Sequence, residues 1–109
     1  MTAFKKIPYE DTKDHKLYLE AMVQIAVAKK TKKENDFKLA LRITEEIEDD
    51  WRRVESLRTI ASALIEAEEI DWALLLTERM DPYRRAQITA KIAKKETGSI
   101  EEAMKKMNN

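Results

Sequence analysis

Apolar side chains recur every three or four residues along most of this chain, which is the period of an amphipathic helix. The clearest run places five of them on one face between residues 51 and 67: Val54, Leu57, Ile60, Ala61 and Leu64. Only one Gly and two Pro interrupt the 109 residues. Because such stretches hold few helix breakers, the pattern predicts an all-helical protein.

About six helices are expected. The first five span residues 16–30, 37–47, 51–67, 72–80 and 82–95. Asp36 and Asp71 are placed to cap the second and the fourth. Gly98 is expected to end the fifth helix. Ser99 and Glu102 then have the spacing of a capping box, which predicts a short sixth helix after them.

One phrase of thirteen residues occurs three times, with offsets of 35 and 32 residues. The copies are DHKLYLEAMVQIA from Asp14, DDWRRVESLRTIA from Asp49 and DPYRRAQITAKIA from Asp81. Self-similarity at this period is typical of helical repeat arrays. Each Asp is therefore expected to cap the first helix of a two-helix unit.

A second phrase alternates with the first. ALRITEEIEDD begins at Ala40, ALLLTERMDP begins at Ala73, and AMKKM at Ala103 is a shortened third copy. Thr44 and Thr77 are equivalent residues of this phrase, and each hydroxyl is expected to donate to a carbonyl of the preceding turn. The two phrases together predict a repeat domain over 14–109, with units of about 14–48, 49–80 and 81–107, after an N-terminal extension of residues 1–13.

The stretch RTIASALIEAEEIDWALLLTERMDP resembles a tetratricopeptide-type unit, and the resemblance extends over residues 14 to 107. It implies antiparallel helical hairpins stacked as a short right-handed α–α superhelix. It also implies a scaffold for protein recognition, without catalytic residues to carry over. Where that family usually has Gly at a tight helix contact, this chain has Ala61 or Ala93.

The composition argues against several kinds of functional site. The chain has no Cys and a single His, His15, which argues against a zinc site or a histidine-based triad. No metal or other cofactor is therefore expected. No apolar run reaches the length of a membrane span, and the first residues lack the apolar centre of a signal peptide. We expect a cytoplasmic protein, with a Lys- and Glu-rich composition that also suits a thermophile.

Charge is unevenly distributed although the net charge is zero. Residues 1–38 carry +3, residues 39–81 carry −7 and residues 82–109 carry +4. This layout, together with the apolar AMKKM tail, predicts self-association through the ends of the array. The alternatives are separate basic and acidic partner surfaces, or an ordinary salt-bridged helical surface.

Four residues are the candidate partner-binding site: Trp51, Arg52, Tyr83 and Arg84. They occupy matching positions in two copies of the first phrase, and we call them the aromatic–arginine edge. Such an edge suits the binding of an acidic peptide or the stacking of bases. The structural alternative packs each aromatic ring against the preceding helix. It also pairs Arg53 and Arg85 with the acidic residues just upstream: Glu45, Glu46 or Glu78.

The sequence favours a non-catalytic protein–protein interaction module with a protein or peptide partner. The alternative is a nucleic-acid-binding accessory protein that uses the edge and the lysine run KKTKK at 29–33. A neutral domain argues against nucleic acid, because such domains are usually basic. The acidic runs at 45–50 and 66–72 lack the spacing and the Gly of a calcium loop.

Overall fold

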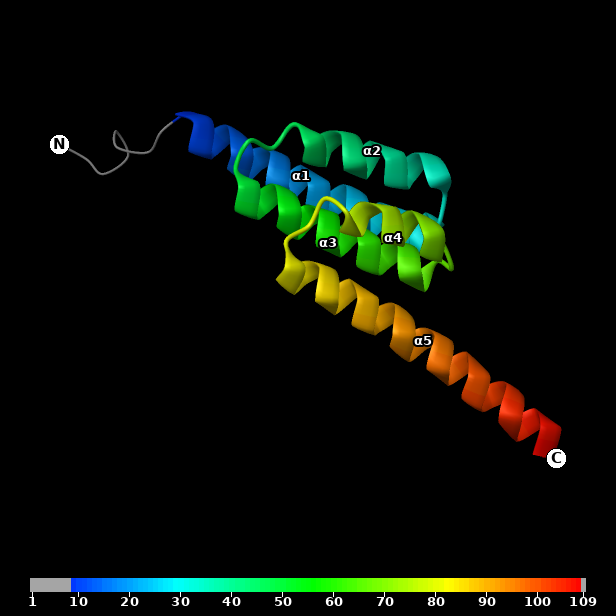
Figure 1. The fold of residues 1–109 in the computed structure, drawn as a ribbon. Coiled ribbons are helices and arrows are strands. Elements are labelled where there is room, and N and C mark those ends of the chain that lie inside the picture. The colour runs from blue at the N-terminus through cyan, green and yellow to red at the C-terminus, as the bar shows by residue number, and fades with distance from the viewer. Residues whose placement is uncertain (1–8, 109) are drawn as a thin grey trace.

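The computed structural model describes residues 9–108, and side chains from residue 12 onward. Its five helices are shown in Figure 1: α1 (Tyr9–Thr31), α2 (Glu34–Glu45), α3 (Asp50–Glu66), α4 (Ile70–Thr77) and α5 (Pro82–Asn108). No strand occurs in this part of the chain. The predicted all-helical class is confirmed, with five helices in place of about six.

The central helix is α3, which packs against each of the other four. Helices α1, α3 and α5 begin at the same end of the molecule and run in similar directions, while α2 and α4 run back beside them (Figure 1). The C-terminal half of α5 extends away from the other helices, so the longest dimension reaches 72 Å.

The predicted break at Gly98 is wrong, because α5 passes through it without interruption. Gly98 has an ordinary negative φ, and a Cβ added there would meet no atom within 4 Å. The Ser99 hydroxyl donates to the Lys95 carbonyl at 3.2 Å, so it bonds within the helix and does not cap a new one. A single helical Gly costs only about 1 kcal/mol, which this helix tolerates. The tail AMKKM is therefore the end of α5.

Other helix starts also differ from the sequence prediction. Asp36 and Asp71 lie in the first turns of α2 and α4, and the N-cap residues are Lys33 and Glu69. Helix α3 lies within a residue of its prediction. Its cap is Asp49, whose carboxylate accepts from the Arg52 amide at 2.9 Å.

The three repeated Asp residues have two different roles. Asp81 caps α5 as Asp49 caps α3, by accepting from the Arg84 amide at 2.9 Å. Asp14 does not cap a helix, because α1 begins five residues earlier. Asp14 is buried, and its carboxylate accepts from the amides of Glu48 and Asp49 at 3.0 and 2.8 Å. The first copy therefore stabilises the turn that leads into α3.

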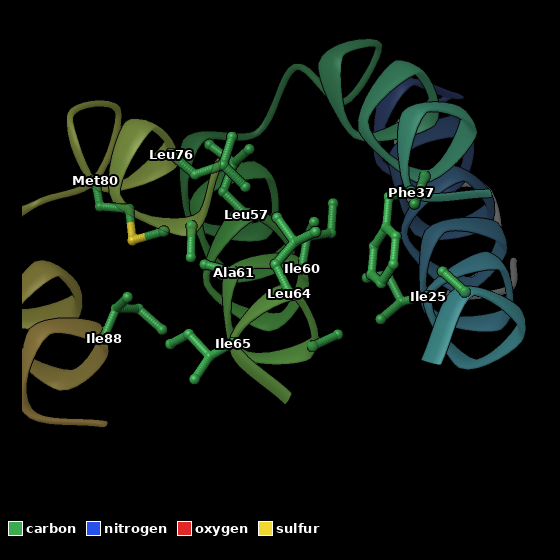
Figure 2. Packing of buried hydrophobic residues seen from close by; sticks show 14 of the residues in the cluster. Ile25, Phe37, Leu57, Ile60, Ala61, Leu64, Ile65, Leu76, Met80 and Ile88 are labelled. Atoms are coloured by element: carbon green, nitrogen blue, oxygen red, sulfur yellow. The ribbon is translucent and has the colours of Figure 1, made fainter. Parts of the chain in front are cut away.

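The core is built around α3 (Figure 2). Matching positions of the repeated phrase are buried in every copy. One position holds Ile25, Ile60 and Ile92, and another holds Ala21, Ser56 and Ile88. Of the two alanines noted at the resemblance, Ala61 is buried and Ala93 is exposed, because α5 has no helix on that side.

Candidate interaction surface

The aromatic–arginine edge lies at the N-terminal ends of α3 and α5, which are neighbours in the fold (Figure 1). The Asp49 and Asp81 caps place Trp51 and Tyr83 in the first turn of their helices. Their side chains remain 59% and 73% exposed. The structural alternative, in which each ring packs against the preceding helix, is therefore wrong. Large aromatic side chains this exposed call for an explanation.

Arg84 is held by three groups and is not free. Its Nε lies 3.0 Å from Glu55 Oε1, and its Nη1 lies 2.5 Å from Asp81 Oδ2. Its guanidinium carbon is 5.6 Å from the centroid of the Trp51 ring, which is within cation–π range. The side chain is only 14% exposed. Arg84 thus links α5 to α3 and holds one face of Trp51.

The acidic partner of this link is kept ionised. Arg58 donates to Glu55 Oε2 at 2.5 Å, and this hydrogen bond is the main reason that the pKa of Glu55 is lowered. The Arg84 bond lowers it further, while burial opposes both. The pKa of Asp81 is also lowered, first by the backbone amide of Arg84. Two arginines and two carboxylates therefore form a neutral cluster beneath the edge.

Arg53 and Arg85 have a repeated structural role. Each guanidinium donates to backbone carbonyls in the turn before its helix or at the end of the preceding helix, at distances of 2.9 to 3.2 Å. The acceptors belong to Ile47 and Glu48 in one copy and to Thr77 and Met80 in the other. Neither arginine pairs with an upstream glutamate within residues 12–108: Arg53 pairs with Asp50 of its own helix, and Glu45 pairs with Arg79 at 3.2 Å. The second arginine of each phrase therefore holds a turn closed.

Arg52 is the remaining charge of the edge. Its side chain is partly exposed and makes no hydrogen bond or ion pair within the described part of the chain. The four predicted site residues therefore differ in how accessible their side chains are. Trp51 and Tyr83 face solvent, Arg52 is accessible, and Arg84 is a support.

The lysine run lies near the opposite end of α3 from the edge. Lys29, at the end of α1, is 3.9 Å from Glu66, at the end of α3. Lys91 and Lys95 of α5 pair with Glu66 and Glu68 at 3.5 and 3.2 Å. The 17-residue α3 places this end about 25 Å from the edge. The edge and the lysine run therefore do not form one basic surface.

A second exposed surface was missed by the sequence analysis. Leu19, Val23 and Val27 follow one another at steps of four along α1 and are 50%, 65% and 40% exposed. Two of them, Leu19 and Val23, line a shallow groove with Ile43 of α2. The signal was present, because residues 17–28 of α1 are mostly apolar, including these three on the side opposite the buried Ala21 and Ile25.

Metal and membrane sites are not seen in residues 9–108. No group of three His, Cys, Asp or Glu side chains there is arranged to hold a metal ion. None of the described helices is long and apolar enough to span a membrane. His15 is exposed on α1.

Comparison with protein-family models, curated proteins and solved structures finds no match to this chain.

Proposed function

We propose that this protein is a non-catalytic interaction module built from a short array of three helical units. The units correspond to residues 14–48, 49–80 and 81–107, and the third has a single long helix. Matching buried positions and the matching Asp caps of α3 and α5 support the array. A right-handed superhelical stack of the tetratricopeptide type is the arrangement that we propose for it.

The observation that carries this proposal is the exposure of Trp51 and Tyr83 on a rigid support. Trp, Tyr and Arg are the residues most enriched among binding hot spots. Arg84 fixes the Trp51 ring from one side, so the ring loses little freedom on binding. We infer a protein partner that brings an apolar side chain to the rings and a carboxylate to Arg52.

Affinity capture from lysate of the source cells tests the proposal, with the wild type compared with Trp51→Ala/Tyr83→Ala. Both side chains are largely exposed, so the variant should keep its fold, as circular dichroism can verify. Leu75→Ala is the control, because Leu75 is 62% exposed and belongs to α4, which contributes no residue to the edge. Arg84 is left intact since it supports the structure.

The proposal predicts a protein that the wild type and the Leu75→Ala control retain and the double variant loses. Binding that is equal for all three proteins would contradict a role for the edge. Nucleic acid that is released by high salt would support the alternative, since phosphate contacts weaken as salt rises.

A further inference from the structure

The free half of α5 carries large apolar side chains on one side. Ile100, Met104 and Met107 are 60%, 56% and 83% exposed, and their part of the helix extends away from the rest of the molecule (Figure 1). A gathering of exposed apolar side chains marks interaction surfaces in soluble proteins. Helix α5 therefore presents a face that the described fold does not cover.

This face continues a regular pattern along the helix. Steps of four and three residues alternate through seven exposed positions: Ala86, Ala90, Ala93, Thr97, Ile100, Met104 and Met107. The buried residues Ile88 and Ile92, which join the core, lie on another side. Alternating steps of four and three residues are the pattern of a coiled-coil seam. The seam is narrow in its first half, where the side chains are small, and broad in its second half.

We propose that the seam pairs with the seam of a second copy of this chain, as an antiparallel coiled coil about a two-fold axis. Antiparallel pairing sets the small half of each seam against the large half of the other, which fills space evenly. A parallel pair would instead set alanine against alanine and methionine against methionine. The central layers are Ala90 with Met107 of the partner subunit, Ala93 with Met104 of the partner subunit, and Thr97 with Ile100 of the partner subunit.

The charges beside the seam select this direction and register. Lys94 lies next to Glu101 of the partner subunit, and the two-fold axis makes the pair twice. A shift of seven residues one way sets Lys94 against Lys94 of the partner subunit. The opposite shift sets Glu101 against Glu101 of the partner subunit. A parallel pair sets Glu96 against Glu101 of the partner subunit, which also repels.

The self-association that the apolar AMKKM tail helped to predict thereby gains a specific face, formed by α5. The pairing ends at Ala90, so it leaves Tyr83 and the aromatic–arginine edge free at both ends of the dimer. A dimer would present two edges to a partner and raise its avidity. The pairing itself is independent of the proposed function, because it needs only α5.

Sedimentation of the full chain over a concentration series, at low salt, tests the pairing. The wild type should dimerise. Glu101→Lys places a second positive charge beside Lys94 of the partner subunit, and Lys94→Glu creates the opposite repulsion. Each change should weaken the dimer by about tenfold or more in Kd. The double variant Lys94→Glu/Glu101→Lys should recover the wild-type affinity. Lys106→Glu is the control, because residue 106 lies on the far side of the helix from the seam.

Circular dichroism of each variant verifies that α5 stays helical. A wild type that remains monomeric into the millimolar range would overturn the proposal. Tighter association by Glu101→Lys would also overturn it, because in a parallel pair that change replaces the repulsion of Glu96 with an attraction. Single variants that dimerise like the control would exclude this register.

Discussion

Neighbouring residues of one repeated phrase have opposite roles. In the third copy Tyr83 faces solvent, Arg84 is nearly buried, and Arg85 binds backbone carbonyls. The sequence predicted that each of the three copies starts a helix, which is correct for the copies at Asp49 and Asp81 and wrong for the one at Asp14. It did not separate the supporting arginine from the exposed ring, because that depends on Glu55, which lies 29 residues before Arg84.

The first prediction concerns Glu55, whose carboxylate joins Arg58 and Arg84. Glu55→Gln should lower the free energy of unfolding by about 1–2 kcal/mol at neutral pH, because two charge-assisted hydrogen bonds weaken. The lowered pKa of Glu55 means that this stability exists above its ordinary value of 4.5 and is lost as the pH falls below it. Urea unfolding of both proteins across this range measures the effect. The difference between them should shrink with acid, and a constant difference would contradict the account.

The second prediction concerns two equivalent threonines. The Thr77 hydroxyl donates to the Leu74 carbonyl at 2.6 Å, as the sequence predicted. The prediction is wrong for Thr44, whose hydroxyl is fully buried without a protein partner. Thr44→Val should therefore raise the free energy of unfolding by about 1 kcal/mol, since it removes an unsatisfied hydroxyl. Thr77→Val is the matched control and should not stabilise. A loss of stability in the Thr44→Val protein would indicate a partner for that hydroxyl.

At the scale of the helix, the repeated phrases predicted where α3 and α5 begin, but not where α5 ends. The third helix was placed within a residue, because the Asp49 cap and the apolar period coincide there. The fifth was cut short at Gly98, because one helix breaker beside a capping pattern resembles a boundary. A Cβ at Gly98 would meet no atom within 4 Å, so contacts there do not explain the continuity of α5; the strong helix formers at residues 94–96 and 101–103 favour it.

The third prediction follows from that continuity. Gly98→Ala should stabilise α5 by about 0.5–1 kcal/mol, since a Cβ has open space there and Ala restricts the unfolded chain. Helical content and the midpoint of thermal unfolding should both rise. Ser99→Ala, one residue later, is the control for a general effect of alanine. A drop in helicity in the Gly98→Ala protein would favour the predicted helix end.

At the scale of the whole molecule, α3 holds the helices together. The sequence predicted its core face, because the apolar period is regular there. It did not predict the exposed groove between α1 and α2, or the projection of α5. The apolar residues of both surfaces are visible in the sequence, but which face finds a neighbour depends on packing between helices that are distant along the chain.

The fourth prediction addresses this central role. Ile60 is fully buried in the middle of α3, so Ile60→Ala should cost about 2–5 kcal/mol of unfolding free energy. Chemical denaturation measures it, with Leu75→Ala as the exposed control. A cost below about 0.5 kcal/mol would mean that α3 does not face the core in this way.

Fluorescence of Trp51 tests the central claim most directly, because it observes the proposed binding side chain itself. The chain has two tryptophans, and the other, Trp72, packs against Phe37 with ring centroids 6.0 Å apart. A Trp72→Phe protein therefore reports on the edge alone. Titration with the captured partner should shift the Trp51 emission to shorter wavelength and protect it from acrylamide. A partner that binds while the emission and the quenching stay unchanged would contradict the account.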